Sequence, residues 1–479
     1  MFLFKDIKQY HNELNGNQTN CVEAVKHYLL LIEENKKLNA FTEIYSSEAL
    51  EKAIELDEKR RTGEPLKKLH GVVIAIKDVI CYKDHTVTAA SKILEGFKSL
   101  YTATAIQRLL DADAIIIGSC NCDEFAMGSS NENSAYGNVL NALDHTKVPG
   151  GSSGGSAVAV QAGLCMASLG SDTGGSVRQP ADFCGIIGLK PTYGRISRYG
   201  LIAYASSFDQ IGIFSAAIDD MALLLEIMSG ADEYDSTALQ KTSKNFTALL
   251  PGKTTYRIAY FKEALHHPSL DIEIKESILS LIDTLRSNGH TIIEIDFDLL
   301  DYVVPAYYVL TTAEASSNLN RYDGIRFGYQ TKTVVKDLTD FYKQNRSRAF
   351  GKEVQRRILL GTFVLSSGYY DTYFSKAQQV RRLLTNKTDA IFTEFDAIIM
   401  PTSPTTAFAI GDKTNDPVAM YLADIFTVFA NLTGIPGISV PLFKHSNGMP
   451  FGLQIMTKKT DELTLLQMAD LLMKQYRGN

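Results

Sequence analysis

Apolar and polar positions in the first part of the chain alternate between two kinds of segment. Residues 21–60 read as two helices, and residues 104–112 again carry apolar side chains at helical spacing. Residues 72–76 and 114–117 are instead short, unbroken apolar runs, which predict strands buried on both faces. Strand, helix and strand in this order are typical of an α/β fold with a largely parallel sheet.

The later half of the chain shows the same alternation. The spacing predicts strands over 257–261, 291–295, 396–401, 434–440 and 452–456, and helices over 271–287, 307–318, 351–385 and 460–474. Neither end of the chain offers a self-contained set of strands, and no internal repeat is visible. Strands from both ends are therefore predicted to share one sheet.

Composition and charge narrow the class of protein. Of the 479 residues, 21% are charged and 45% are hydrophobic, which is typical of globular proteins. The net charge of −6 argues against a general electrostatic grip on nucleic acid by this chain alone, and leaves room for a local basic patch. Charges at Lys5 and Asp6 come too early for a secretory signal, and no run approaches the ~18 uncharged apolar residues of a membrane span.

The six cysteines show no metal-binding pattern. Cys120 and Cys122 are one residue apart, without the two-residue gap and the second pair of a zinc site. We therefore predict no metal site, and expect the reduced thiols of a cytosolic protein.

A stretch of small residues, 147–156, contains nothing but Gly and Ser from residue 150 onward, and a second Gly-Gly-Ser follows at 174–176. A flexible linker has a similar composition, but it is flanked by polar sequence. Here the segments between the two stretches, 157–163 and 167–170, are small and apolar, as expected of packed structure. Glycines in such surroundings allow close backbone approach and expose N–H groups. We interpret the two stretches as the floor of an active site.

Two motifs near these stretches point to other chemistry and are incomplete. Residues 150–154 fit the G-x-S-x-G turn of α/β-hydrolases, but 143–149 is no buried strand and His445 lies in a polar turn, so a Ser-His-Asp triad is the less favoured alternative. Pro251-Gly-Lys-Thr254 resembles the end of a P-loop, but Thr247 stands where the first glycine is required. No ATP site is expected in this chain.

Without a suitable histidine, a lysine is the candidate base. Lys77 ends the predicted strand at 72–76, where burial lowers the pKa of a lysine toward neutrality and makes the free amine available. Serine–lysine pairs are an established variant of the serine–histidine arrangement. The alternative is that Lys77 is an ordinary surface lysine at a strand end.

Three motifs taken together resemble those of the amidase signature family. They are Ala75-Ile-Lys-Asp78, Gly150-Gly-Ser-Ser-Gly-Gly155 and Asp172-Thr-Gly-Gly-Ser-Val-Arg178, and the separations of 75 and 24 residues between Lys77, Ser152 and Ser176 are those of the family. The resemblance implies that Ser176 is the nucleophile, Lys77 the base and Ser152 the proton relay. The backbone N–H groups of Thr173, Gly174, Gly175 and Ser176 are expected to form the oxyanion hole, because Gly-Gly lets amides turn inward.

The resemblance also implies the fold. We expect a single large α/β domain over residues 1–479, with a mixed, mostly parallel central β-sheet covered by helices on both faces. Within it we expect an N-terminal helical segment at 1–65 and a catalytic core at 66–215. An insertion-like region of helices and a βαβ unit at 235–395 is expected to contribute substrate contacts.

Within the family, the likeness is greatest to glutaminase subunits and covers nearly the whole chain. It implies that Tyr307, Arg357 and Asp424 bind glutamine. The chemistry agrees, because an arginine can pair with the α-carboxylate of glutamine and an aspartate with its ammonium group. Tyr308 and Arg356 stay open as alternatives, and Arg357 can also be interpreted as a helix-surface arginine.

The resemblance further implies a cytoplasmic, heterotrimeric amidotransferase in which this chain hydrolyses glutamine and supplies ammonia. A B subunit would carry ATP, magnesium and most of the tRNA contacts, and would convert Glu-tRNA(Gln) to Gln-tRNA(Gln). A small C subunit would bridge the two, and this chain would hold no cofactor. The alternatives are a stand-alone amidase for small or aryl amides and a catalytically inactive scaffold, which the intact Lys77, Ser152 and Ser176 disfavour.

Overall fold

The computed structural model describes residues 4, 6–240, 245–250, 252–413 and 417–476. Within them, eleven strands form one sheet in the order β1-β3-β2-β4-β6-β5-β10-β11-β9-β7-β8. The strands are β1 (Phe41–Ile44), β2 (Val73–Lys77), β3 (Ile115–Cys120), β4 (Ala167–Asp172), β5 (Ile187–Lys190), β6 (Gln210–Ser215), β7 (Arg257–Phe261), β8 (Thr291–Ile295), β9 (Ala397–Pro401), β10 (Gly437–Lys444) and β11 (Pro450–Met456). Strands from both ends of the chain share this sheet, as predicted.

The directions of the strands correct one expectation. The sheet is mixed, but in the described part of the chain six of its ten strand pairings are antiparallel, so it is not mostly parallel. The parallel pairings are confined to β3-β2-β4 and to β9-β7-β8. Apolar runs show that strands are buried but not which way they run. The turn at 445–449 joins β10 to β11, and a connection this short can only join strands that run antiparallel.

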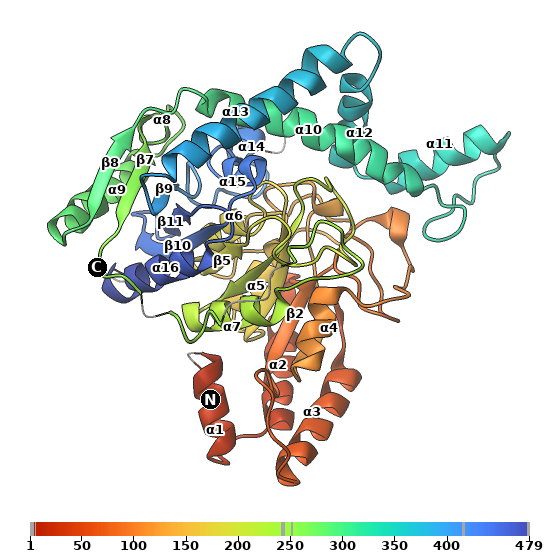
Figure 1. Cartoon of the computed structure of the whole chain (residues 1–479). Coiled ribbons are helices and arrows are strands. Elements are labelled where there is room, and N and C mark those ends of the chain that lie inside the picture. The colour runs from red at the N-terminus through yellow and green to blue at the C-terminus, as the bar shows by residue number, and fades with distance from the viewer. Residues whose placement is uncertain (1–3, 5, 241–244, 251, 414–416, 477–479) are drawn as a thin grey trace.

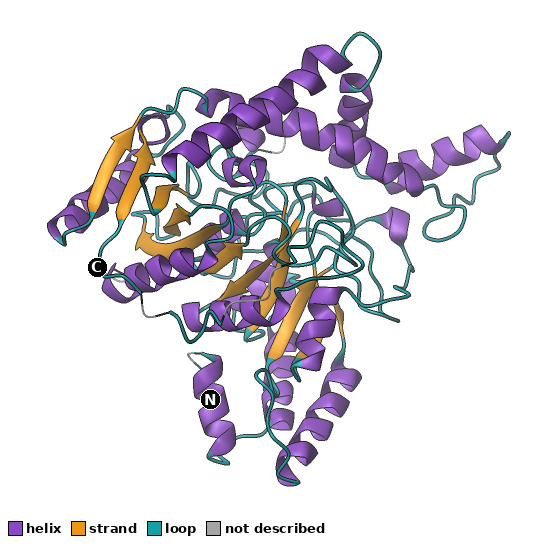
Figure 2. Cartoon of the chain, viewed as in Figure 1, coloured by secondary structure: helices purple, strands orange, loops and turns teal. Residues whose placement is uncertain are grey.

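Helices cover both sides of the sheet (Figures 1 and 2). They are α1 (Ile7–Asn15), α2 (Cys21–Glu34), α3 (Ser46–Arg61), α4 (Thr104–Asp111), α5 (Gly154–Gln161), α6 (Arg178–Cys184), α7 (Ile218–Met228), α8 (Lys262–Leu265), α9 (Ile272–Ser287), α10 (Val303–Asn318), α11 (Leu338–Ala349), α12 (Lys352–Val364), α13 (Lys376–Ile391), α14 (Pro417–Leu422), α15 (Val428–Thr433) and α16 (Glu462–Tyr476). No helix among the described residues is long and apolar enough to cross a membrane.

The helix predicted over 351–385 is in fact two helices. α12 ends at Val364, and the chain turns at Gly368, whose φ of +86° is open to glycine at little cost. A π-helical turn at Asp371–Ser375 then leads into α13. The break lets α12 and α13 run separately past α10, and both helices pack on it.

The parts expected within the domain, at 1–65, 66–215 and 235–395, stay a prediction. Residues 1–65 carry α1 to α3, which extend to the bottom of the view in Figure 1. The strands β7 and β8 lie inside 235–395, yet they join the common sheet through the pairing of β7 with β9.

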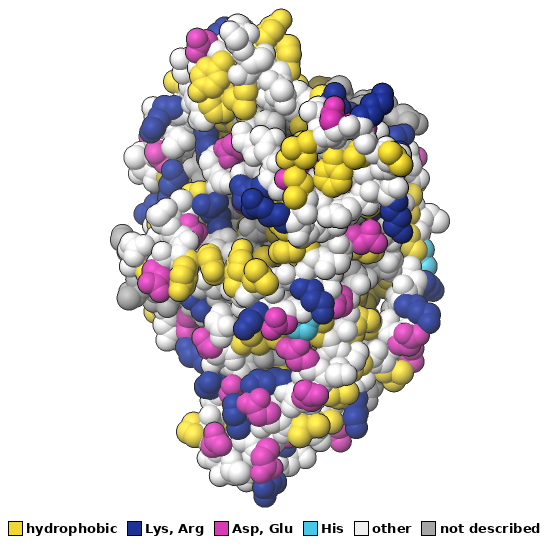
Figure 3. Space-filling model, turned by 90° about the vertical axis from the view of Figure 1, so that its right-hand side faces the viewer, with side chains coloured by type: hydrophobic (Ala, Val, Ile, Leu, Met, Phe, Trp, Pro, Cys, Tyr) yellow, Lys and Arg dark blue, Asp and Glu magenta, His cyan; other side chains and the backbone are white. Residues whose placement is uncertain are grey.

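On the face shown in Figure 3, acidic and basic side chains are interspersed, so no single sign of charge covers it.

The parallel strands β2 and β4 position the site. Ile74 pairs with Ala167 and Ile76 with Leu169, so both strands end at the same edge of the sheet. Lys77 is the last residue of β2, and the turn at 173–177 follows β4 directly. The carboxyl edge of parallel strands is where α/β proteins bind their ligands. The fold therefore brings the first and third motifs to one place.

Candidate active site

Lys77 lies at the centre of a cluster of hydroxyl groups. Its Nζ is 2.7 Å from Ser152 Oγ and 2.9 Å from both Ser153 Oγ and Ser171 Oγ. The side chain is fully buried, and this burial lowers its pKa to about 8. No carboxylate in the described part of the chain forms an ion pair with it. This burial excludes the alternative interpretation of Lys77 as a surface lysine at a strand end.

The Gly/Ser stretch holds Ser152 because its backbone packs directly on other main-chain and carboxylate atoms. A Cβ added at Gly151 would lie 2.1 Å from Asp123 Oδ2, and one at Gly155 would lie 2.3 Å from the carbonyl oxygen of Asn121. Neither position accepts a larger residue without movement of the backbone. All residues from 148 to 160 are buried, so this stretch is packed structure and not a hinge.

Ser176 lies in the turn between β4 and α6. Its side chain is 8% exposed, whereas Lys77 and Ser152 are 0% exposed. Of the three residues predicted to react, Ser176 alone therefore has contact with solvent, as a nucleophile that meets a substrate requires. The buried Ser152 is suited to carry a proton inward to Lys77.

One of the four predicted oxyanion donors is already engaged. The N–H of Gly175 donates to Asp172 Oδ1 over 2.8 Å, because the turn closes on that carboxylate. The N–H groups of Gly174 and Ser176 have no acceptor among the described residues. The Thr173 side chain donates to Asp209 Oδ1 over 2.7 Å and fixes the start of the turn. The backbone N–H of Thr173 likewise has no acceptor among the described residues, so Thr173, Gly174 and Ser176 are the better donors of the predicted set.

Asp172 and Arg178 brace this turn and do not react. Arg178 Nη2 lies 2.9 Å from Asp172 Oδ1, and both side chains are fully buried. Burial alone would raise the pKa of Asp172, but the Arg178 guanidinium lowers it to about 2. Asp172 is therefore ionised at neutral pH. Asn431 donates to the same Oδ1 over 2.9 Å and ties the turn to α15.

Arg357 points inward and Arg356 outward, which favours Arg357 of the two candidate arginines that the sequence left open. The Arg357 side chain is 4% exposed, whereas that of Arg356 is 49% exposed. Arg357 Nε donates to Glu353 Oε1 and its Nη1 to Tyr204 Oη, each over 2.8 Å. Its guanidinium also lies 5.4 Å from the centre of the Tyr308 ring. These contacts hold a buried positive charge in place.

Asp424 lies beside the two candidate tyrosines. Its Oδ2 accepts hydrogen bonds from Ser129 Oγ over 2.6 Å and from Tyr308 Oη over 3.3 Å. Burial raises the pKa of Asp424 to about 7. Tyr307 faces the oxyanion turn instead, since a Cβ added at Gly174 would lie 2.3 Å from Tyr307 Oη. The two neighbouring tyrosines thus contact different groups, Tyr308 the Asp424 carboxylate and Tyr307 the turn at Gly174.

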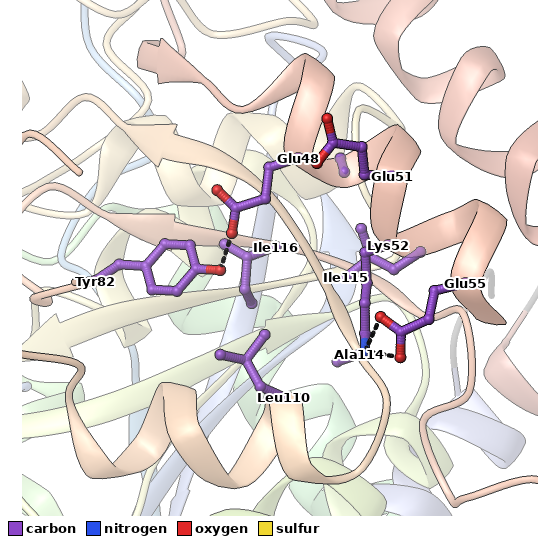
Figure 4. A pocket seen from close by; sticks show the side chains of 10 residues that line it. Glu48, Glu51, Lys52, Glu55, Tyr82, Leu110, Ala114, Ile115 and Ile116 are labelled. Carbon is purple, nitrogen blue, oxygen red and sulfur yellow. Dashed lines mark hydrogen bonds and ion pairs between the residues drawn. The ribbon is translucent and has the colours of Figure 1, made fainter. Parts of the chain in front are cut away.

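A cavity of about 380 Å³ is lined by residues that include Gly128, Arg357 and Tyr421. A different cavity, of about 360 Å³, lies between α3 and α4 and is lined by Glu48, Lys52, Glu55 and Tyr82 (Figure 4). That second cavity contains none of the predicted site residues.

His445, the histidine considered for a Ser-His-Asp triad, pairs with carboxylates of another segment. His445 lies 3.3 Å from Asp271 and from Glu273 at the surface. The described residues contain no cluster of His, Cys, Asp or Glu that could hold a metal, and all six cysteines are free and buried.

Several residues that complete the site were not predicted. Ser171 contacts Lys77, Ser129 contacts Asp424, and Tyr204 and Glu353 hold Arg357. Most of these contacts join segments more than 90 residues apart, which no local pattern reveals. Glu353 is the exception, because it lies one helical turn before Arg357.

Comparisons with known proteins agree with this geometry. The profile of the family described as Amidase matches residues 23–466. A relative from Chlorobium phaeobacteroides, named as the A subunit of glutamyl-tRNA(Gln) amidotransferase, is 48% identical over 471 residues, 98% of either chain. The crystal structure of the protein of the same name from Thermotoga maritima has a TM-score of 0.78 and 37% identity, and covers 95% of this chain and 92% of that one. A native peptide amidase from Stenotrophomonas maltophilia has a TM-score of 0.81 and 27% identity, over 98% and 97%.

The family match spans most of the chain, and the relatives are matched over almost their full length. The Lys77 cluster, the Gly-Gly-Ser turn and the mixed sheet are the features that the family resemblance implied. The chain belongs to the amidase family, the amidase signature enzymes.

Proposed function

We propose that this chain is the glutaminase subunit of a glutamyl-tRNA(Gln) amidotransferase. One observation supports the proposal beyond a general amidase: Arg357 and Asp424 are both buried beside Tyr308, and the neighbouring Tyr307 packs against Gly174 in the turn that carries Ser176. A neutral amide has no use for a buried cation and carboxylate. Glutamine carries both an α-carboxylate and an α-ammonium group, and needs both partners.

The proposed reaction begins with Ser176. Its Oγ attacks the side-chain amide carbon of glutamine, and its proton passes through the Ser152 hydroxyl to the neutral amine of Lys77. The C=O bond opens to an oxyanion, which accepts hydrogen bonds from the N–H groups of Thr173, Gly174 and Ser176. By analogy with other oxyanion holes, each donor contributes about 3 kcal/mol to the transition state.

The tetrahedral intermediate then collapses. The C–N bond breaks, and the proton held by Lys77 returns through Ser152 to the leaving nitrogen, which departs as ammonia. A water molecule attacks the glutamyl ester on Ser176 and gives its proton to the same relay. Glutamate leaves, and Ser176 recovers its proton.

The proposal includes the partners. The relatives are named as the A subunit of an amidotransferase, which supports a complex in which a B subunit uses ATP and magnesium to amidate Glu-tRNA(Gln), and a small C subunit bridges the two. This chain would hold no cofactor, and tRNA would be bound mainly by the B subunit. Such a complex works in the cytoplasm, where aminoacyl-tRNA is found.

The experiment is to co-express the chain with candidate B and C subunits, to purify the complex and to measure ammonia release from glutamine. We expect the three chains to co-purify and glutaminase activity to accompany amidation of Glu-tRNA(Gln). Full activity on aryl amides without any partner, together with no preference for glutamine, would instead support a stand-alone amidase. The structural likeness to a peptide amidase is what keeps that second candidate in view.

A further inference from the structure

A cavity of about 620 Å³ lies next to α15, apart from the substrate site. It is lined by residues of α13, by the end of α15 and by loop residues that include those following β5 and β11. They are Thr192, Tyr193, Ser207, Leu239, Gln378, Arg381, Arg382, Thr385, Leu432, Thr433, Gly434, Lys459 and Thr460. None of the side chains that bind Lys77, Arg357 or Asp424 is in this set. Its volume falls within the ~300–1,000 Å³ of small-molecule sites.

The charge of this cavity has one sign. Arg381, Arg382 and Lys459 line it, and no Asp or Glu does. Among the residues that the structure describes, none of these three cations forms an ion pair. Three cations around one hollow raise the local concentration of anions.

Arg381 is held in place by neutral groups. Its Nε donates to the carbonyl oxygen of Leu432 over 2.9 Å, and its Nη2 to that of Ser207 over 2.9 Å. Its Nη1 donates to Ser207 Oγ over 3.0 Å. A guanidinium has five N–H groups, so Arg381 is oriented by the protein and keeps donors for a ligand. The Glu314 carboxylate, which accepts the N–H of Ser207 over 2.9 Å, lies near Arg381 but forms no direct ion pair with it.

The threonine hydroxyl groups that line the cavity differ in whether their protons are free to donate to a ligand. Thr385 and Thr433 already donate to main-chain carbonyl oxygens. Thr192 Oγ1 accepts the N–H of Thr460 over 2.9 Å, which leaves its own proton for another acceptor. A ligand in this cavity would therefore interact mainly with the cations, and would also accept a hydrogen bond from the Thr192 hydroxyl.

We propose that this cavity binds a phosphate group. A phosphate monoester carries up to two negative charges and three acceptor oxygens, which match several cations better than a single carboxylate does. Arginine forks are suited to phosphate geometry, and lysine binds phosphate as a point charge. The phosphate can belong to a free phosphorylated compound or to an RNA backbone. The site is independent of glutamine hydrolysis and does not rest on the function proposed above.

The test uses the full chain and two probes at one fixed ionic strength. Radiolabelled pyrophosphate is measured by equilibrium dialysis, and a tRNA transcript by filter binding with pyrophosphate as competitor. The variant is Arg382→Gln with Lys459→Gln, two exposed cations outside the proposed catalytic machinery. The control is Lys26→Gln with Lys37→Gln, which makes the same change of net charge on exposed positions of the N-terminal segment.

We expect saturable binding of at least one probe, weakened tenfold or more in the cavity variant and unchanged in the control, with glutamine hydrolysis unchanged in both. Binding of pyrophosphate but not of the transcript would assign the site to a free phosphorylated compound. Binding of the transcript that pyrophosphate displaces would assign it to an RNA backbone. No saturable binding by the unaltered chain, or equal weakening in cavity variant and control, would overturn the proposal.

Discussion

The amine of Lys77 and the hydroxyl of Ser152 lie 2.7 Å apart in the interior, although 75 residues separate them in the chain. The contact exists because β2 delivers Lys77 to the edge of the sheet at which the Gly/Ser stretch enters α5. A lysine surrounded by hydroxyl groups and removed from water loses its proton more readily than one in solvent. The pair is therefore suited to accept a proton near neutral pH.

The pH dependence of kcat/KM follows from this environment. The folded pKa of Lys77, about 8, lies below its usual value because burial disfavours the charged form. Below pH 8 the lysine is protonated and cannot accept the proton of Ser176, so kcat/KM should rise with pH and level off above about 8. Asp424, whose burial raises its pKa to about 7, must also ionise to bind the ammonium group of glutamine.

A neutral amide substrate distinguishes the ionisation of Lys77 from that of Asp424, because its binding does not need the Asp424 carboxylate. Its profile should keep the ionisation of Lys77 and lose that of Asp424. A flat profile between pH 6 and 9 on both substrates would contradict the assignment of Lys77 as the base.

Arg357→Ala should strongly lower kcat/KM for glutamine and spare a neutral aryl amide. Loss of a charge-assisted pair with the α-carboxylate raises the barrier by about 1.5–3 kcal/mol, or roughly 10- to 100-fold in kcat/KM. Arg356→Ala is the matched control, since the neighbouring side chain points to solvent and should leave both activities unchanged. Equal loss of both activities in Arg357→Ala would show that Arg357 is structural.

Removal of the hydroxyl group of Tyr307 and of Tyr308 should change kcat and KM in different ways. Tyr308→Phe removes a hydrogen-bond donor from Asp424, so the pKa of Asp424 should rise further and KM for glutamine should increase about tenfold. Tyr307→Phe removes the hydroxyl that packs on Gly174 in the oxyanion turn and should lower kcat more than it changes KM. Steady-state kinetics of the two variants check this, and identical effects on kcat and KM would argue against separate roles.

Arg178→Met should destabilise the fold. It leaves the buried carboxylate of Asp172 without its cation, and breaking a buried pair in this way costs about 3–5 kcal/mol. Urea unfolding of the variant should begin at clearly lower concentration, and the exposed Arg326→Met is the control expected to unfold as the parent does. A parent-like unfolding curve for Arg178→Met would mean that the turn at 173–177 is held by other contacts.

Much of the fold was predictable from local pattern. The strands over 257–261 and 291–295 match β7 and β8, because each is a short run bounded by polar residues. Strand direction was not predictable, because side chains report burial and not partners. The break at Gly368 was missed because α12 and α13 carry compatible helical spacing on either side of it.

The site was predictable in part. The choice of Arg357 over Arg356 was available from spacing, since Val354, Arg357, Gly361 and Val364 form the buried stripe of α12. The contacts of Tyr204 with Arg357 and of Ser129 with Asp424 depend on how distant segments pack. The roles of Lys77, Ser152, Ser176 and the oxyanion turn stay predictions, which the geometry supports.

The central claim is that Ser176, and not a serine of the Gly/Ser stretch, carries the acyl group. The most direct measurement is acid quenching of the assembled complex during turnover of glutamine, followed by peptide mapping of the acylated residue by mass spectrometry. The account predicts a glutamyl ester on Ser176, its slower formation in Ser152→Ala and its absence in Ser176→Ala. An ester on Ser152 or Ser153, or one that persists in Ser176→Ala, would contradict it.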